Sequence, residues 1–255
     1  MGGDNSPDAT LNGAYLASKN LKENEKIVLV GDENIAKKWF LSNHIDSSIF
    51  EFIHADEVIT MNEHATKALR KKPNNSISVG FKALKEKKID VFSSAGNSGA
   101  MLVGSMFSIG PIKGVIRPSI TSVLPKKNGG VGLILDVGVN ADCKPDVLFQ
   151  FAILGSLFAE NIYNIKTPRV GLLNIGEEKG KGNLLTQATY RLLEDNDDIN
   201  FIGNVEGRDL FNDKADVIVC DGFTGNVVLK LAESFYTLIN QKKISDPYFD
   251  RFNYE

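Results

Sequence analysis

Cysteine and histidine are scarce in this sequence, and both shortages limit the chemistry that the protein can perform. The chain has 255 residues but only two cysteines, Cys143 and Cys220, which excludes a disulfide framework and suits a reducing cytoplasm. Its three histidines, His44, His54 and His64, are not spaced like metal ligands, so no metal is expected. Cys220 ends an apolar run, where a small buried side chain is a more common role than a nucleophile.

Long apolar runs and a strong excess of one charge are also missing. No stretch reaches the roughly 18 apolar residues of a membrane-spanning helix. The N-terminal sequence MGGDNSPDAT has neither the basic start nor the apolar core of a secretory signal peptide. A net charge of −3 gives no general attraction to nucleic acid, so nucleic acid is not an expected partner. The remaining composition, 42% hydrophobic and 24% charged, is that of an ordinary globular protein.

Short β-branched runs alternate with longer amphipathic segments along the chain. Several of the short runs are almost wholly apolar, which indicates burial on both faces and a mostly parallel sheet. We therefore predict an α/β fold with a doubly wound, mostly parallel sheet between helices. The expected strands are Ile27–Gly31, Ile89–Ser94, Gly132–Val137, Val170–Ile175, Asn200–Gly203 and Asp216–Asp221. The expected helices are Ala9–Leu21, Ile35–Leu41, Ser76–Lys85, Gly99–Ile109, Pro145–Asn161, Leu184–Leu193 and Val227–Asn240.

The domain organisation is expected to be simple. Residues 1–255 are predicted to form a single α/β domain, with a helical segment at 227–255 within it. The chain opens on the turn-like GGDNSP and closes on the aromatic YFDRFNYE, so flanking pieces are expected to be missing at both ends.

Four of the expected strands end in a glycine-rich turn that leads into a helix. These turns are AGNSG at 95–99, GVNADCKPD at 138–146, GEEKGKGN at 176–183 and GFTGN at 222–226. In a parallel sheet such turns gather at the carboxyl edge, where ligands bind, and the helix N-termini behind them attract anions. Ordinary turn and cap chemistry explains any single turn, but four at one expected edge favour a site for phosphate or another small anion.

The sequence contains partial matches to known catalytic and nucleotide-binding motifs, but each lacks a required residue. Ala100 follows Gly96-Asn97-Ser98-Gly99 and breaks the spacing of a nucleophile elbow. Gly180-Lys181-Gly182 lacks both the hydroxyl residue of a P-loop and the third glycine of a dinucleotide fingerprint. A reaction that needs no protein nucleophile fits best, and no cofactor is expected.

In combination, these turns resemble those of the bacterial phosphate acyltransferases of phospholipid synthesis. The resemblance covers the whole chain. It is carried by MGGDNSPDAT at 1–10, SAGNSGAM at 94–101, IRPSI at 116–120, LDVGVNADCKPD at 135–146, VGLLNIGEE at 170–178, KGN at 181–183, IGNVEGRD at 202–209 and VIVCDGFTGNVVLK at 217–230.

The resemblance implies a reaction, a fold and a set of partners. Such enzymes transfer a fatty acyl group from acyl carrier protein to inorganic phosphate, and the acyl phosphate passes to a membrane glycerol-phosphate acyltransferase. Their fold is similar to that of isocitrate and isopropylmalate dehydrogenases and of phosphotransacetylases, usually as a homodimer. The rivals are a phosphotransacetylase that uses coenzyme A, a decarboxylating dehydrogenase of the same fold, and a non-enzymatic, membrane-associated scaffold of lipid metabolism.

The implied reaction indicates which residues form the site. Phosphate is already an anion near neutral pH, so positioning and charge compensation matter more than a deprotonating triad. The catalytic candidates are Lys181 as the cation, Glu178 to orient it, and Asn97; a solvated loop lysine and a helix-starting carboxylate are the alternatives for the first two. The substrate-binding candidates are Asp4, Ser94, Gly96, Ser98, Gly99, Asp136, Asn140, Asn204, Glu206, Arg208, Asp221, Gly222, Thr224, Gly225 and Asn226.

Some of these candidates have an equally good structural explanation. Asp4, Asp136, Asn140 and Asp221 would order the site by holding its turns, or would simply cap them. Arg208 would either bind an anion or pair with a nearby carboxylate.

Two surface features bear on partners and location. A basic cluster would attract the acidic acyl carrier protein, although a solvated helix face explains it too; its members are Lys67, Arg70, Lys71, Lys72, Lys82, Lys85, Lys87 and Lys88. Segment 227–255 would serve as a dimerisation helix or a membrane-touching tip; its apolar stripe is Val228, Leu231, Phe235, Leu238 and Ile239, followed by Tyr248, Phe249, Phe252 and Tyr254. The expected location is the cytoplasm, with peripheral contact on the inner face of the membrane.

Overall fold

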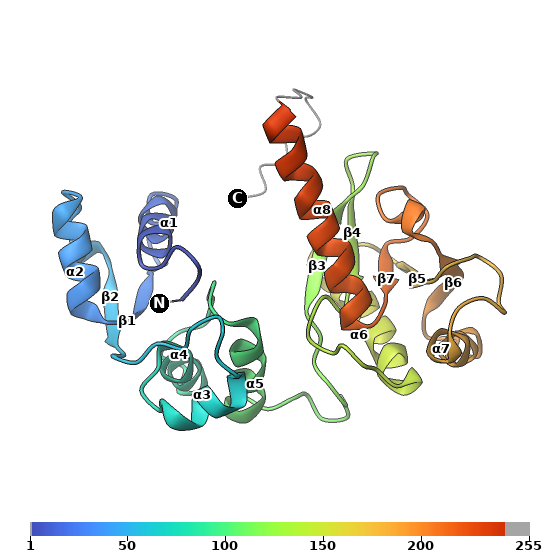
Figure 1. The fold of residues 1–255 in the computed structure, drawn as a ribbon, viewed down its shortest axis with the longest axis horizontal. Coiled ribbons are helices and arrows are strands. Elements are labelled where there is room, and N and C mark those ends of the chain that lie inside the picture. The colour runs from blue at the N-terminus through green and yellow to red at the C-terminus, as the bar shows by residue number, and fades with distance from the viewer. Residues whose placement is uncertain (1, 243–255) are drawn as a thin grey trace. The chain divides into compact units, whose positions relative to one another are not determined.

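The chain forms two compact units, Met1–Lys113 and Gly114–Glu255, in this computed structural model. The structure describes residues 2–242, apart from the side chains of Asn240 and Lys242. Each unit is described below by itself (Figure 1). The expectation of one domain over 1–255 stays a prediction.

The first unit combines a small parallel sheet with α-helices. Strand β1 (Val28–Gly31) pairs in parallel with β2 (Glu51–His54). The α-helices of this unit are α1 (Asp8–Ser18), α2 (Glu33–Ser42), α3 (Ala65–Lys71), α4 (Ser76–Lys85) and α5 (Ser98–Ser108), and a 3-10 turn spans Ser47–Ile49. The predicted strand at 27–31 and the predicted helices of this unit are confirmed within a few residues, whereas β2 and α3 were not predicted.

One predicted strand of this unit is wrong. Ile89–Ser94 has no ladder partner in the described part of the chain and is not a strand. Its apolar side chains serve other purposes: Phe92 packs edge-on against Phe81 with 5.1 Å between ring centroids, while Val91 is 79% exposed. The short apolar run therefore packs onto α4 through one ring instead of entering a sheet.

The second unit is built on a five-stranded sheet. The strands are ordered β3-β4-β7-β5-β6, with β3 antiparallel to β4 and the other pairs parallel. The strands are β3 (Thr121–Pro125), β4 (Val131–Leu135), β5 (Arg169–Leu173), β6 (Asn200–Val205) and β7 (Val217–Val219). The α-helices are α6 (Pro145–Tyr163), α7 (Leu184–Glu194) and α8 (Gly222–Lys242), and a 3-10 turn spans Gly207–Asp209.

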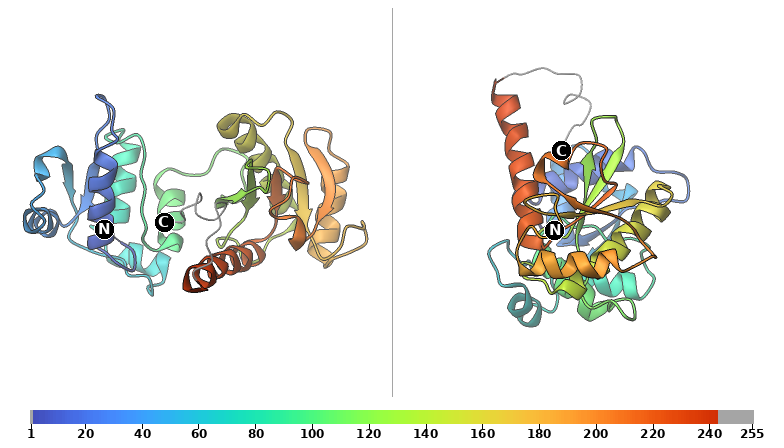
Figure 2. Two further views of the ribbon diagram at one scale, coloured as in Figure 1. Left: turned by 90° about the horizontal axis from the view of Figure 1, so that it is seen from above. Right: turned by 90° about the vertical axis from the view of Figure 1, so that its right-hand side faces the viewer.

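Both faces of this sheet are covered, as the apolar strands predict. Leu133 and Leu135 of β4 pack with Phe151 of α6 in one buried cluster. Ile134, between them, belongs to a second cluster that includes Leu229 of α8. Helices α6 and α8 consequently lie on opposite faces of the sheet (Figure 2). The predicted α/β fold with a mostly parallel sheet flanked by helices is confirmed.

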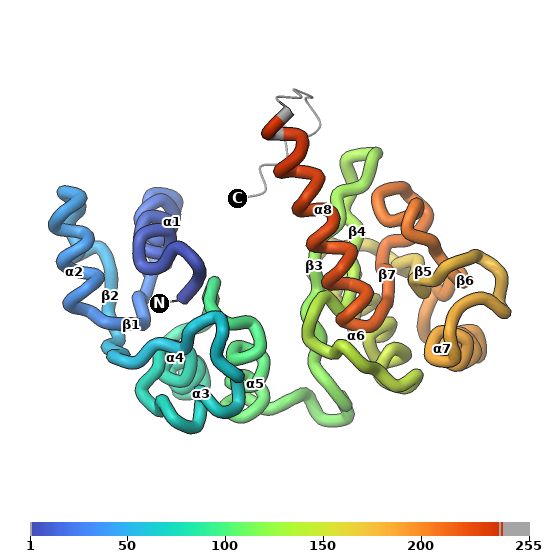
Figure 3. Tube along the Cα trace, in the orientation of Figure 1, coloured from blue at the N-terminus to red at the C-terminus, as the bar shows by residue number. Residues whose placement is uncertain are grey.

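Three parallel strands of this sheet lead into a helix. The chain passes from β4 into α6, from β5 into α7 and from β7 into α8 (Figure 3). Helix α8 begins at Gly222, five residues before the predicted start at Val227, because Asp221 caps it. None of the helices in the described residues has both the length and the apolar character needed to cross a bilayer.

Candidate functional site

Three of the four glycine-rich turns meet at one edge of the second unit. They follow β4, β7 and β5, which are adjacent in the sheet and parallel, so their carboxyl ends share an edge. The fourth turn, 95–99, lies in the first unit and follows no strand. The predicted site residues therefore fall into two groups, one in each unit.

The turn after β4 is organised by Asp136. This carboxylate is fully buried, and its Oδ1 accepts a hydrogen bond from the N–H of Ile120 at 2.9 Å. Its Oδ2 accepts from the backbone N–H of Asn140 at 2.5 Å and from the side-chain amide of Asn140 at 2.9 Å. The same amide donates to the carbonyl of Pro118. Asp136 and Asn140 thus hold the turn, one of the two roles expected for them.

The turn after β7 packs directly onto this structure. Asp221 caps α8 by accepting hydrogen bonds from the N–H of Thr224 at 2.8 Å and from its hydroxyl at 3.0 Å. A Cβ on Gly222 would lie 2.7 Å from Oδ2 of Asp136, and one on Gly225 would lie 1.9 Å from its carbonyl oxygen. Only glycine permits this approach, so the N-terminus of α8 lies against the β4 turn.

Asn226 completes this contact from the first turn of α8. Gly138, at φ +106°, would place a Cβ 3.1 Å from Oδ1 of Asn226. Thr224 is half-buried and Asn226 is exposed. The predicted residues of these two turns are therefore brought together around the start of one helix, whose first N–H groups are bonded to Asn140 and Asp221.

Cys143 lies in the turn after β4, Cys220 directly precedes the turn after β7, and both thiols have a raised pKa. Burial, together with the nearby carboxylates of Asp136 and Asp221, raises the pKa of the Cys143 thiol to about 11. Cys220 is 3% exposed, and burial raises its pKa even more strongly. Both thiols stay protonated near neutral pH, which agrees with the small buried role expected for Cys220.

The turn after β5 presents Lys181 to solvent. Within the described residues neither Lys181 nor Glu178 makes an ion pair. The backbone N–H of Lys181 donates to the carbonyl of Glu178 at 3.0 Å. A Cβ on Gly176 would lie 2.9 Å from the Glu178 carboxylate and 3.0 Å from Cγ of Lys181, so both side chains stand over Gly176. The exposed ammonium group of Lys181 is therefore available to bind an anionic ligand.

Both ends of the Asn204 side-chain amide are already hydrogen-bonded. Its Nδ2 donates to the carbonyl of Glu178 at 2.9 Å, and its Oδ1 accepts from Asn174 at 3.1 Å. Asn204 is 3% exposed. Two further amides that hold the loop, Asn174 and Gln187, were not among the predicted residues, although Asn174 directly follows the apolar run of its strand.

Arg208 pairs with a carboxylate in this structure. Its guanidinium contacts Glu206, while three-quarters of the Arg208 side chain remains exposed. Glu206 is also part of an acidic cluster with Glu177 and Asp209 whose oxygens lie within 4.8 Å of one another. Lys214 bridges Glu177 at 2.7 Å and Asp209 at 3.0 Å. Because cations already compensate this cluster, it has the features of a structural charge network.

The first-unit group is centred on Asn97. This side chain caps α5 by accepting from the N–H of Ala100 at 3.0 Å. Its Nδ2 donates to the carbonyls of Thr60, Met61 and Glu63 at 3.0–3.2 Å. Through these bonds the side-chain amide of Asn97 holds the turn at 60–63, and its oxygen caps the start of α5.

The N-terminal residues pack against the same turn. A Cβ on Gly2 would lie 2.8 Å from Cα of Gly96, and Gly3, at φ +113°, lies against Ala95. The hydroxyl of Ser94 accepts from the N–H of Gly96 at 3.1 Å. Asp4, which follows these glycines, is exposed, as is Ser98 of the turn, while Gly99 is half-buried.

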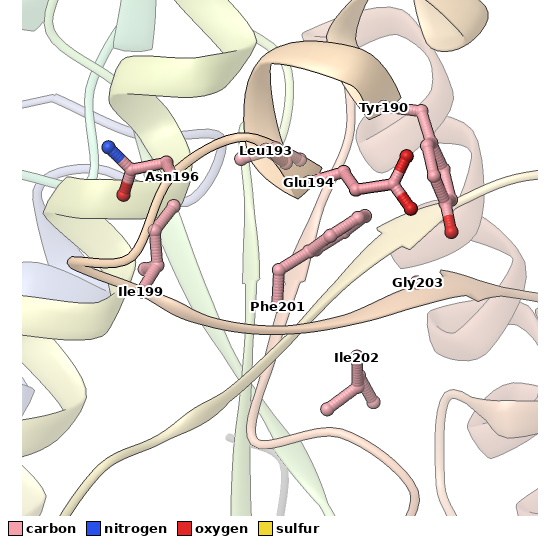
Figure 4. A pocket seen from close by; sticks show the side chains of 8 residues that line it. All are labelled: Tyr190, Leu193, Glu194, Asn196, Ile199, Phe201, Ile202 and Gly203. Atoms are coloured by element: carbon pink, nitrogen blue, oxygen red, sulfur yellow. The ribbon is translucent and has the colours of Figure 1, made fainter.

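A pocket of about 310 Å³ lies between α7 and β6 (Figure 4). Its lining residues are Tyr190, Leu193, Glu194, Asn196, Ile199, Phe201, Ile202 and Gly203, and none of them was a predicted site residue. Leu193 is fully buried and Ile199 is 7% exposed, so their apolar side chains are already used in the core.

Comparison with known proteins shows the family to which this chain belongs. The sequence matches the model of a family described as "Fatty acid synthesis protein" over residues 1–244. The chain belongs to this family. A phosphate acyltransferase of Dictyoglomus turgidum is 49% identical over 233 residues, which cover 91% of this chain and 69% of that protein. A phosphate acyltransferase of Acetivibrio thermocellus is 48% identical over 243 residues, 94% of this chain and 71% of that one. The resemblance found in the sequence is confirmed.

Solved structures show a similar fold at low sequence identity. A branched-chain phosphotransacylase from Enterococcus faecalis superposes with a TM-score of 0.63 at 14% identity, covering 92% of this chain and 82% of that one. The EutD phosphotransacetylase from Staphylococcus aureus gives a TM-score of 0.62, also at 14% identity, covering 90% and 79%. This fatty acid synthesis family member thus has a fold like that of the phosphotransacetylases.

Proposed function

We propose that this protein is a phosphate acyltransferase that moves a fatty acyl group from acyl carrier protein to inorganic phosphate. The observation that carries the proposal is the shared strand edge of the second unit, where the start of α8 and the exposed Lys181 follow neighbouring strands. Membership of the fatty acid synthesis family, and relatives that are phosphate acyltransferases, support the same reaction.

The proposed chemistry needs no nucleophile from the protein. A phosphate oxygen attacks the carbonyl carbon of the thioester, the new C–O bond forms, and the C–S bond breaks to release the carrier thiolate, which then takes a proton from solvent. Phosphate would bind beside the start of α8, where the positive end of the helix dipole favours an anion and where exposed Asn226 lies. The ammonium group of Lys181 would compensate the charge that develops in the transition state. The protonated thiols of Cys143 and Cys220 are consistent with direct transfer.

The acyl donor is proposed to dock on the basic cluster of the first unit. Arg70 and Lys71 lie in the last turn of α3, and Lys82 and Lys85 lie in the last turn of α4. Lys72 is already paired with Glu63 at 2.7 Å, so it contributes less to the attraction. A local basic surface on a protein of net charge −3 would steer an acidic carrier protein.

Helix α8 is proposed to pair with a second copy of the chain. Phe223, Val227, Leu231, Phe235 and Leu238 follow one another at about one-turn spacing and are each roughly half exposed or more. Val228, which the sequence placed on the apolar stripe, instead packs into the sheet's core, and the aromatic residues from Tyr248 onward lie outside the described residues. Contact of this segment with the inner face of the membrane, close to a glycerol-phosphate acyltransferase, is the alternative use. The likeness to the dehydrogenase fold also stays part of this proposal.

The deciding experiment is release of acyl carrier protein from a long-chain acyl thioester. Release should require phosphate and should yield acyl phosphate in equal amount. A matched reaction with a coenzyme A thioester tests the phosphotransacetylase alternative, which predicts the faster rate with coenzyme A. Binding to vesicles with no phosphate-dependent loss of thioester would instead indicate a scaffold and refute the proposal.

A further inference from the structure

The loop that carries Lys181 is held by three side-chain amides from three different elements. Asn174, directly after β5, donates through Nδ2 to the carbonyl of Lys181 at 3.1 Å. Asn204 of β6 donates to the carbonyl of Glu178 at 2.9 Å. Gln187 of α7 donates to the carbonyls of Gly180 and Gly182, both at 3.0 Å. We call these three residues, Asn174, Gln187 and Asn204, the amide clamp.

The clamp is internally connected and tightly fitted. The amide of Asn174 also donates to Oδ1 of Asn204 at 3.1 Å, so two members orient each other. Gly182 lies at φ +92°, and a Cβ there would be 2.3 Å from Oδ1 of Asn174 and 2.1 Å from the hydroxyl of Thr186. The loop backbone therefore lies against the clamp with no space for a side chain at this position.

The clamp also changes the electrostatics of the loop. Main-chain carbonyl oxygens carry partial negative charge, and free carbonyls beside Lys181 would repel an approaching anion. Here the carbonyls of Glu178, Gly180, Lys181 and Gly182 all accept hydrogen bonds from the clamp. The ammonium group of Lys181, by contrast, forms no ion pair within the described residues.

We propose that Asn174, Gln187 and Asn204 are positioning residues that fix the Lys181 loop in a phosphate-receptive conformation. Gln187 acts from the helix that the loop enters, Asn204 acts from β6, and Asn174 acts from the position directly after the neighbouring strand β5. This rests on the proposed function for its link to phosphate, but the clamp itself is a property of the fold. Under this proposal Asn204, which was expected to bind substrate, instead holds the loop that carries Lys181.

The test uses Gln187→Met in the full chain. Methionine has nearly the same length and helix propensity as glutamine, but it cannot donate to Gly180 or Gly182. Asn200→Ala is the control. Asn200 lies on β6, at the opposite end of the strand from Asn204, and its amide donates to the carbonyl of Thr167 at 3.2 Å. Thermal unfolding midpoints of both variants establish that they remain folded.

The first readout does not depend on activity. Trypsin should cut after Lys179 and Lys181 about tenfold faster in Gln187→Met than in the parent or in Asn200→Ala, because a lost hydrogen bond lowers the free energy of local opening. Mass spectrometry identifies these cuts among the others. Unchanged cleavage at both lysines in a folded Gln187→Met would overturn the clamp.

The second readout links the clamp to catalysis. Gln187→Met should raise the KM for inorganic phosphate about tenfold and leave the KM for the acyl thioester unchanged. Gln187→Met should add little to the loss of kcat/KM for phosphate in the Lys181→Ala background, since both changes act through one group. Fully additive effects would overturn the positioning role. Faster cleavage, with turnover unaffected by either Lys181→Ala or Gln187→Met, would keep the clamp and refute the role proposed for Lys181.

Discussion

One oxygen of Asp136 accepts two hydrogen bonds from Asn140, one from its backbone N–H at 2.5 Å and one from its side-chain amide at 2.9 Å. The pair closes the turn after β4, and the carbonyl of Asn140 in turn accepts from the N–H of Gly222 at 2.8 Å. Through these bonds, two segments about 80 residues apart in the sequence form one edge of the candidate site.

Asn140→Ala should destabilise the second unit by roughly 2–3 kcal/mol, because it leaves a buried carboxylate oxygen with one donor fewer. Urea unfolding measures the change. Asn128→Ala is the control, since Asn128 accepts only from Gly130 in the exposed β3–β4 turn and should cost under about 1 kcal/mol. Equal losses for the two variants would contradict the structural role of the pair.

Gly225→Ala should disrupt the contact between α8 and the β4 turn. The added Cβ would meet the carbonyl oxygen of Asp136 at 1.9 Å, and backbone cannot move aside cheaply, so a loss of roughly 3 kcal/mol in unfolding free energy is expected. Gly180→Ala is the control, because a Cβ there meets nothing within 4 Å. A Gly225→Ala protein as stable as its parent would show that α8 does not approach the turn so closely.

Lys181→Ala should lower turnover by about 100-fold or more while leaving the unfolding midpoint unchanged, because an exposed cation contributes to the transition state and not to packing. Lys179→Ala is a close control: Lys179 pairs with Glu194 and lies over the ring of Tyr190, so its loss should cost far less activity. Both rates come from phosphate-dependent thioester loss. Equal effects of the two substitutions would indicate that only the net charge of the loop matters.

The amino edge of the same sheet should make stability sensitive to acid. Burial works to raise the pKa of Asp216, but hydrogen bonds from Arg169 and Lys126 outweigh it and hold the pKa well below its usual range. Lys126, 4% exposed, lies 2.6 Å from Asp216. Because the folded pKa is depressed, this stabilisation is present above about pH 4, the unfolded value, and is lost as the pH falls toward the folded value.

Lys126→Met should therefore cost roughly 3 kcal/mol at pH 7 and a smaller amount at pH 3. Urea unfolding at both pH values measures the difference. Lys26→Met is a suitable comparison, because its ion pair with Glu51 is largely exposed and should change stability little at either pH. A loss in Lys126→Met that did not depend on pH would contradict the assigned pairing.

Five exposed apolar residues of α8, which we call its ridge, predict self-association: Phe223, Val227, Leu231, Phe235 and Leu238. Leu231→Glu combined with Phe235→Glu should convert a dimer into a monomer, as measured by light scattering, because charges replace apolar surface at the centre of the ridge. Glu233→Ala, on the same helix, should leave the mass unchanged. Loss of vesicle binding with no change in mass would favour the membrane role of this segment.

The sequence alone determined the fold class, the positions of most helices and the identity of the turns that matter. Apolar, β-branched runs such as 132–137 and 216–221 have few alternatives to a buried strand. The glycine after each run marks a turn: Gly138 has φ +106°, and a Cβ on Gly222 would lie 2.7 Å from Asp136. The helix caps at Asp32, Asn75 and Asn97 were not predicted from the sequence, although an Asx side chain commonly satisfies the free N–H groups at a helix start.

Only the tertiary structure decided what those residues do. Whether Ile89–Ser94 becomes a strand depends on a partner strand, and the described chain provides none; Phe92 packs against Phe81 instead. The amides of Asn174, Gln187 and Asn204 come from three separate elements, so no local pattern could show that they hold one loop. A hydrogen bond depends on where a distant backbone carbonyl lies, and that position is set by packing across the whole sheet.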